Sequence, residues 1–253
     1  MSNEEQRKVS RRKFLKTSGI AAGGVVGGAI LGGLFQPFQT KQVVQQVPTK
    51  DTDSLQEARM FFRRGEDFET LAAATERIFP KDEHGPGAIE LNVPYFIDKQ
   101  LAGAWGMNND DYMKGPFDPN SWDTHGYQTK LNRAEVFLTG LRRIQEVSQE
   151  EYNETFVNLD GEKQDEILKK LESGEVKMKG VTSDAFFSLL RQATIEGVYA
   201  DPVYGGNKDM QGWKMMEYPG PRMSWEEEVE AEDFLSIEPS SLREYQGGGV
   251  YDG

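Results

Sequence analysis

The segment that decides the fold is TSDAFFSLLRQATIEGVYADP, residues 182–202. Its apolar residues recur at the three- and four-residue spacing of one helix face. The residues on that face are Phe186, Leu189, Leu190 and Ala193. Thr182 or Ser183 can cap the N-terminus, and Asp201-Pro202 ends the segment, because proline cannot continue helical hydrogen bonding. The segment therefore predicts an amphipathic helix that ends near Tyr199.

Weaker helical patterns precede this segment. Apolar residues repeat at helical spacing over 68–79, from Pro94 to about 105, over 128–147 and from Asp160 to 171. Ser148 with Glu151 matches a capping box and predicts one more helix start. Strict alternation never exceeds about four residues, so strands are expected to be scarce. The sequence predicts a mainly α fold, with five or six helices in a single domain.

The predicted organisation has four parts. Residues 1–40 form a signal peptide or N-terminal anchor, and residues 41–62, which lack apolar periodicity, form a linker. Residues 63–202 form the helical domain. Residues 203–253 form a long irregular tail rich in glycine, proline and aromatic residues, with an acidic run, and we expect this tail to bind a partner.

The N-terminal segment has the pattern of a twin-arginine export signal. Ser10-Arg11-Arg12-Lys13-Phe14-Leu15-Lys16 precedes a charge-free, weakly apolar run that contains seven glycines and extends from Thr17 to Thr40. The motif residues are Arg11, Arg12, Phe14 and Leu15. A basic flank before a single membrane span is the alternative reading. The pattern leaves open whether the segment is cleaved or kept as an anchor.

Composition excludes several classes of protein. The chain has no cysteine, which excludes disulfides, thiolate metal sites and covalent haem attachment. Residues 1–16 carry a net charge of +4 within a total of −13, so the remainder carries −17. Phosphate backbones repel such a body, and no nucleic acid is expected as a partner. The acidic run 226–233 is either a solvated tail or a docking segment for a basic partner surface.

The residues needed for catalysis or cofactor binding do not form a recognisable pattern. The only histidines are His84 and His125, and neither has metal-ligand spacing. Phosphate-binding glycine loops and a nucleophile elbow are missing. We therefore expect no catalytic, cofactor-binding or metal residue on this chain. The alternative is an independent exported enzyme or cofactor-binding protein that uses the polar loop 106–127 around Trp122 and His125.

The block from Asp201 to Arg222 combines dense glycine with large aromatic residues. Glycine lets a backbone approach another surface closely, and aromatic residues carry much of the energy of interfaces. The block either binds a partner or covers the core of this domain. The predicted partner-binding residues are Tyr204, Gly205, Gly206, Asn207, Gly212, Trp213, Tyr218, Pro219 and Gly220.

The same block carries a family resemblance. The series Tyr204-Gly-Gly-Asn207, Gly212-Trp213 and Tyr218-Pro-Gly220 resembles the gluconate 2-dehydrogenase subunit 3 family. Further matches are Ile78-Phe-Pro80, Pro94-Tyr-Phe-Ile-Asp98, Arg191 and Asp201-Pro202. The resemblance covers most of residues 65–222. The acidic run beyond Arg222 lies outside it.

The resemblance implies a small subunit that is not catalytic by itself, in a complex of the gluconate 2-dehydrogenase (acceptor) type. FAD would be held by a large subunit of the glucose–methanol–choline oxidoreductase type, and a cytochrome c subunit can accompany it. The small subunit would engage the twin-arginine translocase and assist export and maturation of the large subunit. The complex would lie on the extracytoplasmic face of the membrane. A free-standing exported surface or anchoring protein is a third possibility.

Overall fold

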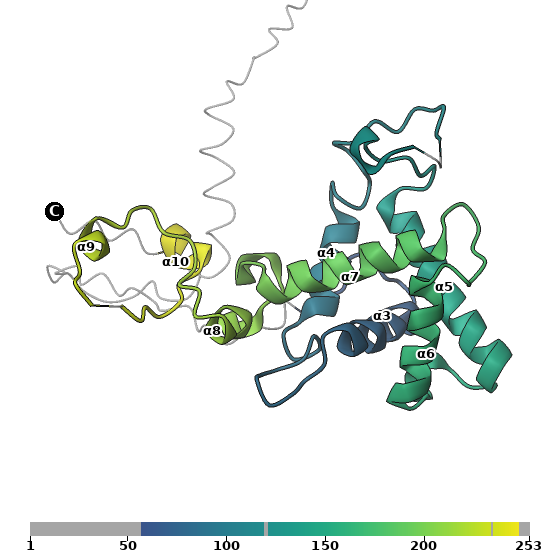
Figure 1. Ribbon diagram of the computed structural model, residues 1–253, viewed down its shortest axis with the longest axis horizontal. Coiled ribbons are helices and arrows are strands. Elements are labelled where there is room, and N and C mark those ends of the chain that lie inside the picture. The colour runs from purple at the N-terminus through teal and green to yellow at the C-terminus, as the bar shows by residue number, and fades with distance from the viewer. Residues whose placement is uncertain (1–56, 119–120, 234, 248–253) are drawn as a thin grey trace, which may run out of the picture. The chain divides into compact units, whose positions relative to one another are not determined.

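The computed structural model describes residues 57–118, 121–233 and 235–247. Within these ranges the chain is helical and contains no β-strand. The long helices are α3 (Gly65–Ile78), α4 (Val93–Ala102), α5 (Arg133–Tyr152), α6 (Gly161–Glu172) and α7 (Ser183–Tyr199) (Figure 1). Three short helices follow: α8 (Gln211–Met215), α9 (Glu226–Val229) and α10 (Leu242–Gly247). The predicted mainly α fold is confirmed.

Several helix ends lie where the local sequence predicts them. Pro94 occupies the first turn of α4, where its missing N–H costs no hydrogen bond. The Asp160 carboxylate caps α6 by accepting a hydrogen bond of 3.0 Å from the Lys163 backbone N–H. Helix α7 starts directly after Thr182 and ends at Tyr199. These ends depend on neighbours in sequence, which explains why they can be predicted.

The predicted helix break at Ser148 is wrong. Helix α5 begins at Arg133, after a capping box formed by Asn132 and Glu135, and continues through Ser148 to Tyr152. Ser148 is fully buried on the face that contains Ile144, and its hydroxyl donates to the Glu154 carbonyl over 2.8 Å. Burial of that face favours a continuous helix over a local cap.

The core lies around α7. This helix packs against α3, α4, α5 and α6 (Figure 1). Helix α3 in turn contacts α4, α5, α6 and α7. Large side chains from different helices are fully buried there, among them Leu71, Phe137, Ile167, Phe186 and Leu190. The Phe137 and Phe186 rings meet edge to face at 6.1 Å between centroids. Helix α7 also contacts α8 and thereby links the core to the segment that follows it.

The chain enters this domain through a clasp built on a buried carboxylate. Asp98 of α4 is fully buried and accepts hydrogen bonds from three consecutive backbone N–H groups, those of Met60, Phe61 and Phe62. The bonds from Phe61 and Phe62 measure 3.1 and 2.9 Å. The Phe62 side chain is buried in the core. The backbone of residues 60–62, which were expected in the linker, is therefore bonded to the domain, although the Met60 side chain stays exposed.

The part of the chain that the structure describes holds no helix with both the length and the apolar character needed to cross a bilayer. The predicted export-signal residues Arg11, Arg12, Phe14 and Leu15 lie outside the described residues.

Candidate functional site

The segment 201–220 closes over the C-terminal end of α7. Asn207, which is fully buried, holds it there with three hydrogen bonds. Its backbone N–H donates to the Gly197 carbonyl (3.0 Å), and its side-chain amide donates to the Ala200 carbonyl (2.8 Å). Its side-chain oxygen accepts from the Gly212 N–H over 2.7 Å. The asparagine thus joins the end of the helix to the start of α8.

Two glycines of this segment touch the α7 backbone. A Cβ atom at Gly206 would lie 2.3 Å from the Gly197 carbonyl oxygen, and one at Gly212 would lie 2.1 Å from the Val198 carbonyl oxygen. Both separations are far below van der Waals contact, so only glycine fits without a backbone shift. Gly205 and Gly220 instead have positive φ angles of 97° and 82°. The close approach that the sequence predicted is made to this chain's own helix.

Trp213 is part of the chain's own core. Its side chain is 4% exposed, and its indole N–H donates to the Tyr199 carbonyl over 2.8 Å. The Tyr218 ring packs edge-on against the Trp213 ring, with 5.3 Å between the ring centroids, and Tyr218 is 45% exposed. Tyr204 is 53% exposed, and Pro219 is half-buried. Among the predicted partner-binding residues, the two tyrosines and Pro219 therefore face the surface, whereas Trp213, Asn207 and the glycines pack inside.

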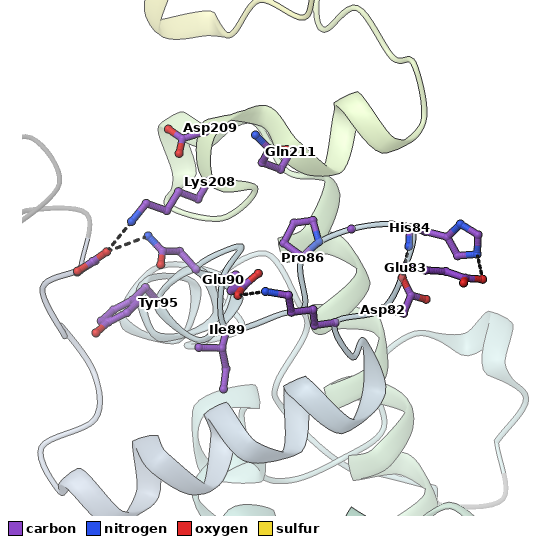
Figure 2. Close-up of a pocket in the computed structure, with 14 residues that line it drawn as sticks. Asp82, Glu83, His84, Pro86, Ile89, Glu90, Tyr95, Lys208, Asp209 and Gln211 are labelled. Atoms are coloured by element: carbon purple, nitrogen blue, oxygen red, sulfur yellow. Dashed lines mark hydrogen bonds and ion pairs between the residues drawn. The ribbon is translucent and has the colours of Figure 1, made fainter.

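A groove of about 860 Å³ lies beside this segment (Figure 2). Its lining consists of the turn 81–86, residues from the chain before α4 and its first turn, residues from the segment before α8, and Glu57: Ile89, Glu90, Asn92, Tyr95, Lys208, Asp209 and Gln211 are the members outside the turn and Glu57. The Lys208 ammonium, which is labelled in Figure 2, and the Asn92 amide both donate to the Glu57 carboxylate, with distances of 3.0 and 3.5 Å. On the other side the Lys81 ammonium contacts Glu90 at 2.7 Å.

Two ion pairs, Lys208 with Glu57 and Lys81 with Glu90, hold four of the charged groups that line this groove. The hydrogen bond from Lys208 lowers the pKa of the Glu57 carboxyl, and the bond to Glu90 raises the pKa of the Lys81 ammonium. Each shift favours the charged form of its group. His84 lies at the outer edge of the groove with its side chain 79% exposed. These groups are paired, ionised and open to solvent. They are therefore better suited to holding segments of the chain together than to transferring protons.

The loop between α4 and α5 is anchored by Arg133. Its guanidinium contacts the Asp111 carboxylate at 2.6 Å and lies over the rings of Trp105 and Tyr127, 5.3 and 5.1 Å from their centroids. At the far end of the loop, Trp122 stacks on His125 with 5.8 Å between centroids. Trp122 is 76% exposed. The pair named as an alternative cofactor site is thus a stack on the surface.

No group of three or more histidine, aspartate or glutamate side chains comes together as a potential metal site in the described ranges. The geometry defines a small helical protein whose glycine- and aromatic-rich segment seals the end of its central helix. The family model for gluconate 2-dehydrogenase subunit 3 matches residues 65–220, more than half of the chain. The chain belongs to this family. No curated protein and no solved structure gives a significant match.

The range of the family match can be compared with the elements of the structure. The match begins at the first residue of α3 and ends at Gly220, which closes the segment over α7. It therefore covers both the helices α3 to α7 and the glycine- and aromatic-rich segment that follows them. The polar chain from Pro221 onward lies beyond the match.

Sequence reasoning missed the Asp98 clasp and the paired groove. A signal for Asp98 existed: it lies between Pro94 and Leu101 on the buried side of α4, where an acidic residue needs hydrogen-bond donors. The groove gave no comparable signal. Glu57, Lys81 and Lys208 are far apart in sequence, and each alone is an ordinary surface charge.

Proposed function

We propose that this chain is the non-catalytic small subunit of an exported flavin-dependent gluconate, sugar or polyol dehydrogenase complex. In this proposal it carries the twin-arginine signal for the complex and assists export and maturation of a large subunit that binds FAD. The observation that carries the proposal is the match of the subunit 3 family model to residues 65–220, on a chain that also contains the motif Arg11-Arg12.

The chemistry of the described residues supports a subunit role. The groove beside Lys208 contains ion pairs that are open to water, and Trp122 and His125 stack on the surface. A flavin isoalloxazine ring needs an enclosed apolar slot together with backbone donors for its phosphates. We propose that FAD and the substrate-binding residues belong to a large subunit of the glucose–methanol–choline oxidoreductase type.

The order of events in this proposal follows from the twin-arginine route, which carries proteins that are already folded. The flavoprotein binds FAD in the cytoplasm, docks on this chain and crosses the membrane with it. The complex then lies on the extracytoplasmic face, and a cytochrome c subunit can accept its electrons. The N-terminal segment provides the contact with the translocase and with the membrane.

Replacing Arg11 and Arg12 by lysine tests the export step. Lysine keeps the charge but lacks the planar guanidinium donors. The double variant is expected to leave both this chain and the flavoprotein in the cytoplasm, as measured by fractionation and immunoblotting. Arg63→Lys with Arg64→Lys is the matched control, because these adjacent arginines are exposed at the start of the folded domain. Export of the flavoprotein in the Arg11→Lys/Arg12→Lys strain would overturn the proposal.

A second measurement tests where the flavin is bound. The full chain purified without its partner is expected to show no flavin absorbance, whereas the co-purified complex is expected to contain about one FAD per large subunit. Stoichiometric FAD in the chain alone, identified by mass spectrometry, would favour an independent enzyme instead.

A further inference from the structure

Exposed apolar side chains gather in one stretch after α8. Six large hydrophobic residues are at least 43% exposed there, namely Met216 (59%), Tyr218 (45%), Met223 (91%), Trp225 (43%), Val229 (76%) and Leu235 (45%). We refer to these six residues as the C-terminal surface. Single exposed apolar side chains are common on proteins, whereas a concentration of large ones marks a candidate interaction site.

A groove of about 500 Å³ has two residues of the C-terminal surface, Trp225 and Leu235, in its lining. Trp225, Leu235 and Ile237 line one part of it, and Trp213 and Pro219 line another. The backbone N–H of Ser240 donates to the Pro219 carbonyl over 3.1 Å, and the N–H of Leu242 donates to the Asp201 carboxylate over 2.8 Å. These two bonds tie the chain beyond the groove to the segment that seals α7, so the groove has fixed walls.

The position of Trp225 is set by Arg222. The Arg222 guanidinium lies 5.2 Å from the centre of the Trp225 ring and 2.5 Å from the Glu228 carboxylate. The cation therefore orients the ring and neutralises one acid. Residues 222–238 contain seven acids and one basic residue, which gives the stretch a net charge of −6. Glu226, Glu230, Glu232 and Asp233 are all exposed.

We propose that the C-terminal surface binds a lysine- or arginine-bearing apolar segment of the flavoprotein subunit. Apolar anchors would enter the groove, and basic side chains around them would face the acidic run. Charge complementarity selects this occupant, because a net charge of −6 over residues 222–238 repels acidic segments and anionic lipid alike. The proposal rests on the proposed function for the identity of the partner.

This assignment moves the predicted interface along the chain. The sequence placed the predicted partner-binding residues between Tyr204 and Gly220, where Trp213 is buried and bonded to Tyr199. The C-terminal surface lies mostly beyond Gly220, where the family match ends. The docking segment would then be particular to this chain and its own partner, whereas the seal over α7 belongs to the family domain.

The test uses the purified full chain and its flavoprotein, with the affinity measured by titration at low and high ionic strength. Trp225→Ala with Leu235→Ala is expected to weaken binding about thirtyfold, as loss of two interface anchors does. A second variant removes four exposed charges: Glu226→Gln, Glu230→Gln, Glu232→Gln and Asp233→Asn. It is expected to associate about tenfold more slowly at low salt, and its association rate should depend less on salt. Both sets replace exposed side chains, so melting temperatures should stay close to that of the unaltered chain.

Matched controls separate the possible outcomes. Trp122→Ala removes an equally large exposed ring elsewhere, and Glu69→Gln with Asp110→Asn, Glu162→Gln and Glu172→Gln removes the same charge from other elements. Neither control should change affinity. If the unaltered chain does not bind the flavoprotein, the proposed function fails. If it binds, but the Trp225/Leu235 variant binds equally well, the docking surface is wrong. A concentration-dependent dimer abolished by that variant would show that a second copy occupies the groove and would also overturn the proposal.

Discussion

Replacing Trp213 by alanine decides whether the glycine- and aromatic-rich segment is core or interface. The side chain is 4% exposed, donates to the Tyr199 carbonyl over 2.8 Å and packs against Tyr218. Removing a buried tryptophan costs about 3–5 kcal/mol, since the cavity fills only in part. For a domain of roughly 150–250 residues each kcal/mol lowers the melting temperature by about 2–4 °C, so a loss of roughly 10 °C is expected.

The assay compares two quantities on the same samples. The melting temperature of the purified chain is measured by differential scanning calorimetry, and affinity for the flavoprotein is titrated well below the transition. We expect the melting temperature to fall and the affinity of the folded molecules to remain unchanged. Trp122→Ala is the control, because a ring that is 76% exposed should contribute less than about 0.5 kcal/mol.

The opposite pattern would refute this reasoning. If Trp213→Ala leaves the melting temperature unchanged and weakens binding, the indole acts at an interface after all, and the observed packing does not describe the free chain. Trp213→Phe refines the result: it keeps most of the ring but leaves the Tyr199 carbonyl without its donor, which costs about 1–3 kcal/mol for a buried group.

Three further predictions concern the domain itself. Asp98→Asn should lower the free energy of unfolding by about 2–4 kcal/mol in denaturant titrations, because an amide N–H would then face backbone donors. An unchanged denaturation midpoint would show that the hydrogen bonds of Asp98 do not stabilise the domain. Gly206→Ala should destabilise by about 1–3 kcal/mol, since the new Cβ meets a carbonyl oxygen of α7, whereas Gly103→Ala, with its nearest neighbour at 3.5 Å, should cost less. Tyr152 donates to the Glu166 carboxylate, which raises the pKa of the phenol to about 12. The stability that this hydrogen bond contributes is complete below the ordinary tyrosine pKa of about 10 and is lost as pH rises through about 12. Comparison with Tyr152→Phe identifies the tyrosinate absorbance of Tyr152. In Glu166→Gln that absorbance should appear at lower pH.

Local signals in the sequence identified most of the helices. Pro94 and Asp160 mark helix starts because one fixes a φ angle and the other supplies a capping oxygen within three residues. The same logic failed at Ser148, whose hydroxyl bonds to Glu154 from within α5. A serine before a glutamate has the composition of a cap, but its buried position on α5 made a continuous helix more favourable.

The sequence predicted which residues are notable in the candidate site, but not which parts of the chain they contact. Tyr204, Asn207 and Trp213 were singled out from the sequence, and the family match covers all three positions. Their partners were not visible, because Asn207 bonds to α7 carbonyls and Trp213 to Tyr199. A glycine that permits close approach does not specify which surface it approaches.

The sequence alone determined that this chain is helical, where α7 begins and ends, and which family it resembles. Periodicity, caps and proline act over a few neighbouring residues, so their effect can be read without knowing the rest of the fold. The tertiary structure decided that the segment after Asp201 seals α7, that Asp98 clasps residues 60–62, and that the Leu242 N–H donates to the Asp201 carboxylate. These contacts join residues distant in sequence. Each is favourable only once the whole domain has ordered, because the entropy of closing the intervening chain must first be overcome.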